Sequence, residues 1–199
     1  MKNFNTYIDV IDMTYWRELC SRKGTLTYYR KGEPFVLCGD LIKYFGFIRK
    51  GYFKYTLTDA KGDESITGFV FEGYIVGDFL STMHEKPIKT NIIAATDAEV
   101  MQCPASELKC QLENSPVQYR MLAEGLFNQA YTQYLSLHTL SPKTRYLALL
   151  NSCPELLQNI TLKELASYLR ITPTHLSRIR KELTFADSTS PVDSTLNLC

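Results

Sequence analysis

The sequence has little of what several protein classes require. It carries 22 Lys and Arg against 21 Asp and Glu, a net charge of +1, so overall charge predicts neither a polyanion-binding nor a membrane-surface protein. The longest uncharged stretch near the middle, residues 125–142, is too rich in amides and hydroxyls to span a bilayer. The first residues include Asp9 and Asp12 and lack a continuous apolar run, so we expect a cytoplasmic protein without membrane contact.

Cysteine and histidine are also sparse and widely spaced. No CxxC pair occurs among the cysteines, which favours free thiols over a disulfide framework, at Cys20, Cys38, Cys103, Cys110, Cys153 and Cys199. A cupin-type metal site needs two histidines close together in one strand, whereas the only histidines are His84, His138 and His175. No Ser/His/Asp set or carboxylate pair stands out. We therefore expect no enzyme, no metal site and no cofactor.

Glycine divides the chain into two parts, because all ten glycines lie between Gly24 and Gly125. From Gly24 to about Cys103, short β-branched and aromatic runs alternate with glycines, which predicts a small antiparallel barrel or sandwich. The clearest turn is DAKGDE at 59–64, where Gly62 can take a positive φ. We predict a β-rich domain over residues 1–114.

A long helix is predicted over 115–140, with Ser115 as N-cap and Pro116 at the first helical position. One apolar row contains Tyr119, Leu122, Leu126, Ala130, Tyr134 and Leu137, and a second contains Met121, Phe127, Tyr131 and Leu135. The rows either pack within the monomer or pair the helix with its copy in a homodimer. In the second case, Leu126→Asp is expected to yield monomers.

Residues 160–183, ITLKELASYLRITPTHLSRIRKEL, contain the most specific motif. Thr161 and Glu164 form a capping box, and Thr172 with Pro173 opens a second helix about three residues after the first ends. The apolar spacing, with small Ala166 at the crossing, is that of a DNA-binding helix-turn-helix. Seven basic residues against three acidic ones over 141–183 favour this interpretation over a hairpin whose basic face is merely solvated.

Polar side chains of this motif are the candidates for DNA contact. Early positions of the second helix suit base edges, and the later basic residues can reach guanine or phosphate. The candidates are Thr161, Thr172, Thr174, His175, Ser177, Arg178, Arg180 and Lys181. Arg170 stands where such turns commonly have Gly, so we expect a left-handed residue there at a cost of roughly 1 kcal/mol. We assign this domain to 141–185, followed by a flexible tail at 186–199.

Several segments resemble the Crp/Fnr family of bacterial transcription regulators. They are KGEPFVLCGD at 31–40, FIRKGYFKYTLTDAKGDE at 47–64, FEGYIVGDF at 71–79, LASYL at 165–169 and LSRIRKEL at 176–183. The resemblance implies an α+β protein: an N-terminal antiparallel β-roll (a jelly roll like a cyclic-nucleotide-binding domain), a long dimerisation helix and a C-terminal helix-turn-helix. A C-terminal β-hairpin wing, commonly turned by Gly in the family, is expected to be absent or degenerate.

The resemblance also implies an effector pocket in the β-roll, formed by Gly77, Asp78, Phe79, Lys86, Ile88 and Lys89. Family members that bind cyclic nucleotides place Glu after the second Gly and Arg after a later Pro, where this chain has Asp78 and Ile88. Without the guanidinium a buried phosphate is uncompensated, and the flanking lysines are poor substitutes. We predict that cyclic AMP is not the effector. Restoration of binding by Ile88→Arg with Asp78→Glu would show an intact pocket shape. An iron–sulfur cluster and a haem bound by His84 are unsupported.

Together these patterns predict a sequence-specific transcription regulator that binds double-stranded DNA as a homodimer. An unknown small-molecule effector and RNA polymerase are further candidate partners. The alternative is a small-molecule-binding β-roll module whose C-terminal helices contact a partner protein.

Overall fold

A computed structural model describes residues 4–7, 11–152 and 154–188. The chain divides between Leu140 and Ser141 into two units, which are described separately. No helix in the described part of the chain is both long and apolar enough to cross a membrane.

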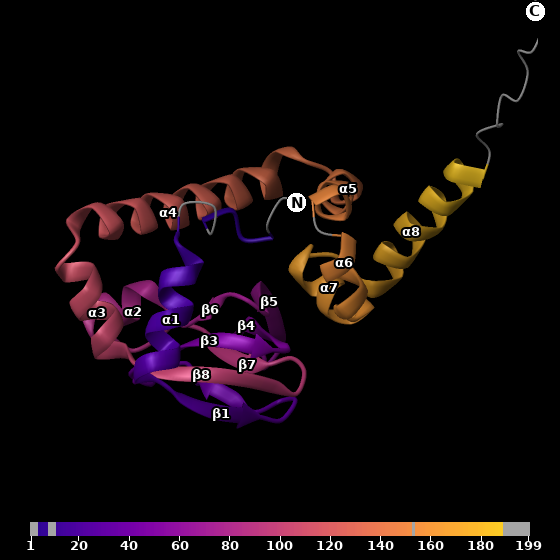
Figure 1. The fold of residues 1–199 in the computed structure, drawn as a ribbon. Helices are drawn as coiled ribbons and strands as arrows, with labels where there is room; N and C mark the ends of the chain where they lie inside the picture. Colours follow the sequence, from indigo (N-terminus) through magenta and orange to yellow (C-terminus); the bar gives the residue numbers. More distant parts are fainter. Residues whose placement is uncertain (1–3, 8–10, 153, 189–199) are drawn as a thin grey trace, which may run out of the picture. The chain divides into compact units, whose positions relative to one another are not determined.

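Two four-stranded antiparallel sheets form the core of the first unit (Figure 1). The first sheet contains, in spatial order, β1 (Thr25–Tyr29), β8 (Ala98–Pro104), β3 (Tyr44–Lys50) and β6 (Ile75–Val76). The second contains β2 (Pro34–Val36), β7 (Asn91–Ala94), β4 (Tyr52–Thr58) and β5 (Glu64–Phe71). Thr25 pairs with Gln102, so strands far apart in sequence are neighbours. The predicted α+β fold with an antiparallel β-roll is confirmed.

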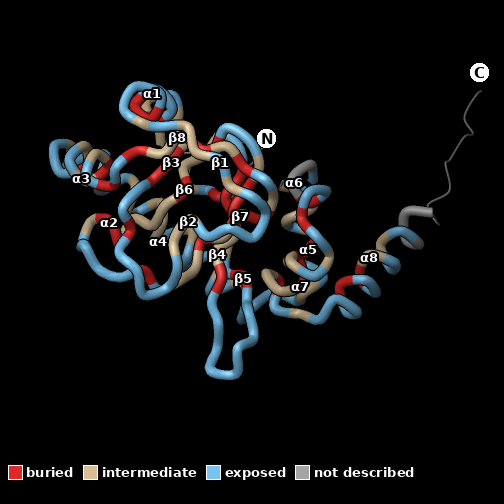
Figure 2. The backbone as a smooth tube through the Cα atoms, turned by 90° about the horizontal axis from the view of Figure 1, so that it is seen from below, coloured by how far each residue is buried: buried red, intermediate tan, exposed pale blue. Residues whose placement is uncertain are grey.

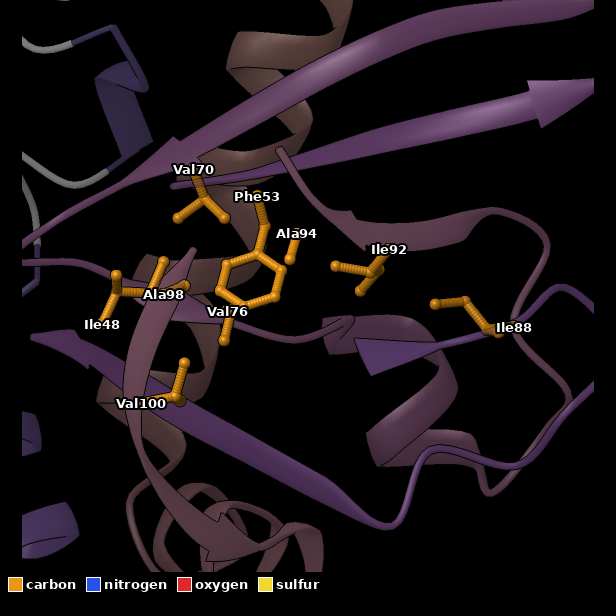
Figure 3. Packing of buried hydrophobic residues seen from close by; sticks show 9 residues of the cluster. All are labelled: Ile48, Phe53, Val70, Val76, Ile88, Ile92, Ala94, Ala98 and Val100. Carbon is orange, nitrogen blue, oxygen red and sulfur yellow. The ribbon is translucent and has the colours of Figure 1, made fainter. Parts of the chain in front are cut away.

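Aliphatic and aromatic side chains fill the space between the two sheets (Figure 3). The nine buried residues are Ile48, Phe53, Val70, Val76, Ile88, Ile92, Ala94, Ala98 and Val100. Burial of each larger side chain stabilises the fold by about 1.5–3 kcal/mol. None of the nine carries a polar side chain, so this interior is apolar.

The β4–β5 connection is the turn predicted at 59–64. Gly62 has φ +88°, and its N–H donates to the Asp59 carbonyl at 3.0 Å. The Asp59 carboxylate accepts from the Lys61 and Asp63 amides at 2.8 and 3.0 Å. The turn is exposed at the tip of the hairpin (Figure 2), and its prediction is confirmed.

Helices cover the outer face of the first sheet (Figure 1). They are α1 (Met13–Lys23), α2 (Phe79–His84), α3 (Ala105–Glu113) and α4 (Pro116–Thr139). Trp16 of α1 and Leu108 of α3 belong to one cluster with Phe45 of β3. Asp12 caps the start of α1, because its carboxylate accepts from two backbone amides of the first turn at 3.0 and 3.2 Å. Ser115 is the N-cap residue of α4, as predicted, but its side chain makes no capping hydrogen bond.

The second unit consists of helices α5 (Pro142–Ser152), α6 (Pro154–Asn159), α7 (Leu162–Tyr168) and α8 (Pro173–Ser188). Its core includes the buried side chains of Leu165, Ala166, Leu169, Leu176 and Ile179. Two further apolar residues of the 160–183 motif, Leu162 and Ile171, are half-buried. Helix α8 extends three residues into the predicted tail. The rest of that tail, and any wing within it, lies outside the described residues.

Candidate nucleic-acid interface and effector pocket

Threonine hydroxyls fix the starts of both motif helices. The Thr161 hydroxyl accepts from the Glu164 amide at 3.2 Å, and the Glu164 carboxylate accepts from the Thr161 amide at 3.2 Å. This is the capping box predicted from sequence. The Thr172 hydroxyl accepts from the His175 amide at 3.2 Å, so it caps α8. Both threonines therefore position helices, and their role in DNA contact stays a prediction.

Arg170 forms the turn between α7 and α8. Its φ is +55°, the left-handed conformation expected at this position, which is confirmed. The Arg170 amide donates to the Ser167 carbonyl and the Ile171 amide to the Ala166 carbonyl, each at 3.0 Å. These two bonds end the helix in the way that usually requires glycine. The turn thus keeps the normal geometry of the motif at the cost of a strained non-glycine residue.

Arg170→Gly is expected to raise the free energy of unfolding of the second unit by roughly 1 kcal/mol, because glycine has no Cβ penalty at positive φ. Urea denaturation followed by circular dichroism measures this change. Arg170→Ala is the control, since it removes the guanidinium but keeps the strain, and it should not stabilise. Equal stabilisation by both variants would mean that charge, not backbone strain, is responsible.

One side of α8 is exposed and carries most of the predicted DNA-contacting residues. Leu176 and Ile179 of this helix are buried. The exposed side chains are Thr174, His175, Ser177, Arg178 and Lys181. Positions 174, 177, 178 and 181 follow the i, i+3, i+4, i+7 spacing of one helical face. This face presents hydroxyl groups near the N-terminal end of the helix and two positively charged side chains further along. Hydroxyl groups can hydrogen-bond to base edges, and positively charged side chains can bind guanine or phosphate.

Arg180 differs from these residues because it is engaged within the unit. Its Nε donates to the Tyr146 hydroxyl at 3.2 Å, and its guanidinium lies 5.6 Å from the centre of the Tyr146 ring. The side chain is half-buried. Arg180 therefore holds α8 against α5, and its predicted DNA contact would have to use its remaining nitrogens.

Two further basic residues of α5 also make contacts within the unit. Arg145 donates from Nη2 to the Leu169 carbonyl at 2.8 Å, at the end of α7. Lys143 pairs with Glu182 of α8 at 3.1 Å, an exposed ion pair of small energetic value. Part of the local positive charge thus organises the motif.

Ile88 fills part of the roll interior where the resemblance places a phosphate. Its side chain is 2% exposed and belongs to the apolar cluster of Figure 3. Its amide donates to the Asp40 carbonyl and its carbonyl accepts from the Gly39 amide, each at 2.9 Å. Lys86 and Lys89, by contrast, are exposed. The two lysines are therefore not part of a buried phosphate site with Ile88.

Tyr55 occupies the space beside Gly77. Its hydroxyl donates to the Gly77 carbonyl at 2.7 Å and accepts from the Gly77 amide at 3.4 Å. Burial raises the pKa of Tyr55 above its ordinary range, so the side chain is neutral at physiological pH. The backbone of Gly77 therefore already has a protein partner for both of its polar groups.

Gly77, Asp78 and Phe79 line a different space, a cavity of about 90 Å³ between β6 and helices α1, α3 and α4. The Asp78 carboxylate accepts from the Ser81 amide at 2.7 Å, so it caps α2. The six residues assigned to one effector pocket thus lie in three settings: this cavity, the roll interior and the exposed loop.

The comparisons with known proteins agree with this architecture. Residues 26–115 match the cyclic nucleotide-binding domain family. Solved structures of Crp/Fnr-family regulators share the fold over 82–89% of this chain. The chain has a Crp/Fnr-type fold. FixK2 from Bradyrhizobium japonicum is 17% identical with a TM-score of 0.72, over 82% of this chain and 86% of FixK2.

Two further structures with this fold have lower TM-scores. The c-di-GMP-responsive regulator CLP of Xanthomonas campestris has a TM-score of 0.65 and 14% identity, over 89% of this chain and 93% of CLP. The catabolite activator protein of Thermus thermophilus has a TM-score of 0.51 and 20% identity, over 85% of this chain and 83% of that protein. No curated protein sequence matches the chain significantly.

The long helix of this Crp/Fnr-type fold divides its apolar residues between two environments. Leu122 and Leu126 line the cavity in the same unit. Phe127 is 70% exposed, and its ring stacks on that of Tyr131, which is 51% exposed, at 5.9 Å between centroids. Leu126→Asp would therefore introduce a charge at the cavity of the monomer, which makes Phe127 the better position for testing self-association.

Sequence reasoning missed three residues that organise these sites. In the first unit, Tyr55 stands in an aromatic strand whose pattern does not distinguish it from its neighbours. In the second unit, Arg145 and Tyr146 lie outside the 160–183 motif. Only the net charge of the segment hinted that α5 belongs to the same unit, so no specific signal could have identified these contacts.

Proposed function

We propose that the protein is a sequence-specific, DNA-binding transcription regulator that acts as a homodimer. The observation that carries the proposal is the exposed face of α8, which presents Thr174, Ser177, Arg178 and Lys181. Thr172 caps α8, and Thr161 caps the start of the preceding helix α7. A helix presented in this way fits the major groove of B-DNA. The Crp/Fnr-type fold supports the same function. Such a regulator acts in the cytoplasm, with RNA polymerase as a candidate partner.

The exposed apolar side of α4 supports the dimer. Within the described residues, exposed Met121, Phe127, Tyr131 and Leu135 repeat along the helix at spacings of six, four and four. A second copy of α4 would remove these side chains from water. Two recognition helices in a symmetric dimer would read half-sites about 34 Å apart, so the operator is expected to be roughly palindromic.

The observed packing also favours an effector other than cyclic AMP. The Ile88 side chain fills the region of the phosphate, and Asp78 caps a helix. A phosphate placed there would meet apolar carbon rather than a guanidinium.

DNA binding is tested by selecting genomic fragments with the purified protein and measuring affinity against salt concentration. Arg178→Ala should cost about 1–3 kcal/mol and relax specificity at one base pair, because a bidentate guanine contact would be lost. Lys181→Ala should weaken all sequences alike and flatten the salt dependence.

Lys86→Ala is the matched control, since it removes one exposed positive charge from the first unit. It should leave affinity unchanged. A wild type that shifts no fragment in a salt-dependent manner would refute the proposal. Capture of a protein by the second unit in that case would favour the alternative, a small-molecule-binding module that contacts a partner protein.

A further inference from the structure

The cavity beside Gly77 lies on the outer face of the first sheet, not inside the roll. Ile75 of β6 lines the cavity, whereas its neighbour Val76 belongs to the cluster between the sheets. Successive residues of a strand point to opposite faces, so β6 separates the two spaces. The cavity is therefore distinct from the position of Ile88.

The walls of the cavity are mainly apolar. Trp16 of α1, Leu108 of α3 and Leu122 of α4 line it. Among the lining residues that the structure describes, Asp78 is the one charged residue and Tyr7 the one with a hydroxyl group. Burial raises the pKa of Tyr7 to about 12, so this hydroxyl is neutral near pH 7. An apolar space with a few polar groups is typical of small-molecule sites.

Hydrogen bonds hold the side of the cavity formed by the N-terminal segment. The Tyr7 amide donates to the Gln129 side chain of α4 at 3.3 Å, and Gln129 donates to the Asn5 side chain at 3.1 Å. Asn5 in turn donates to the Phe69 carbonyl of β5 at 2.8 Å. Asn5 and Tyr7 are thus tied to both α4 and the second sheet, so this wall of the cavity is preformed.

The size of the cavity limits what it can hold. An engineered apolar cavity of about 150 Å³ binds benzene. Benzene has six non-hydrogen atoms, so by proportion the observed volume of about 90 Å³ suits about three or four. An anion is disfavoured because Asp78 is negatively charged and the remaining walls do not compensate a buried charge.

We propose that this cavity is a binding site for a small, neutral amphiphile with a branched hydrocarbon body of about three carbons and one hydroxyl group. The hydrocarbon contacts the Trp16, Leu108 and Leu122 side chains, and the hydroxyl has Asp78 and Tyr7 as available partners. The site is independent of the proposed DNA binding, because every residue involved lies in the first unit.

2-Propanol is a suitable probe because it has this size and chemistry. Trp16 is the only tryptophan of the chain, so intrinsic tryptophan fluorescence reports directly on the cavity. Titration of the full-length protein should give a saturable change with a dissociation constant in the millimolar range. Acetate, which has the same number of non-hydrogen atoms but carries a carboxylate, should give none. A free tryptophan amide titrated in parallel corrects for the effect of the solvent.

Leu122→Phe and Leu108→Phe each fill part of the cavity and should abolish the saturable change. Leu57→Phe makes the same replacement at an exposed position of β4 and should preserve it. Circular dichroism establishes that each variant is folded, and either filling variant suffices. No saturable response of the wild type, an equal response to acetate, or an unchanged response in a folded filling variant would each overturn the proposal.

Discussion

Phe127→Asp is expected to convert a dimeric protein into a monomer. Phe127 is the most exposed large apolar side chain of α4 and stacks on Tyr131, so a symmetric helix pair would bury it. A carboxylate at that position would lose its hydration without gaining a partner, at a cost of several kcal/mol. Sedimentation velocity at micromolar concentration measures the change. Affinity for a palindromic operator should fall at least about 100-fold, because a monomer contacts one half-site.

Asn128→Asp is the matched control for this experiment. It adds the same charge at the next position of the helix, where the side chain is exposed and polar already. It should leave the dimer intact. A strictly monomeric wild type would contradict the proposed assembly, and a dimeric Phe127→Asp variant would place the interface elsewhere.

Ile88→Arg is expected to destabilise the first unit by roughly 3 to 5 kcal/mol, since it places an unpaired charge among apolar side chains. Ile88 is 2% exposed and lies in a cluster without polar members. The combination with Asp78→Glu is therefore expected to give a poorly folded roll rather than a restored cyclic-AMP site. Urea denaturation measures the loss of stability, and calorimetric titration measures nucleotide binding.

Two controls separate packing from charge at this position. Ile88→Leu conserves volume and should cost less than about 1.5 kcal/mol. Lys89→Arg keeps the charge of an exposed neighbour and should change stability by less than about 0.5 kcal/mol. An Ile88→Arg variant that is as stable as the wild type and binds cyclic AMP would contradict this prediction. It would mean that the side chain at position 88 can leave the apolar cluster and contact a ligand.

The second unit could be predicted closely because its signals are local. The Thr161 capping box, the Thr172 cap and the left-handed Arg170 all depend on residues within a few positions of one another. The buried side of each helix follows from apolar spacing. What could not be predicted is the contribution of α5, since the contacts of Arg145 and Tyr146 depend on how the helices pack.

The effector pocket was harder to predict because it depends on contacts between distant segments. Sequence placed Ile88 and Asp78 in one site through the resemblance. In the structure Ile88 lies in the loop between α2 and β7, is bonded through its backbone to Gly39 and Asp40, and packs into the roll, whereas Asp78 caps α2. The cavity gathers residues from β6 and three helices, and no sequence pattern specifies that arrangement. Likewise, the two apolar rows of α4 are visible in sequence, but which of their residues the monomer covers is a tertiary property. Tyr119, Leu122 and Leu126 are partly buried, whereas Tyr134 and Leu137 of the same row are exposed.

The pairing of β1 with β8 has a consequence for the time course of folding. Thr25 meets Gln102 across this pair, and Asn5 meets Gln129 of α4, so the first unit must close long loops before these contacts can form. The loop-closure entropy of such contacts slows folding relative to structures built from near neighbours. The α7–turn–α8 segment requires only short loops. During synthesis, the ribosome must therefore release most of α4 before the first unit can complete its structure, while the later helices can form soon after they emerge.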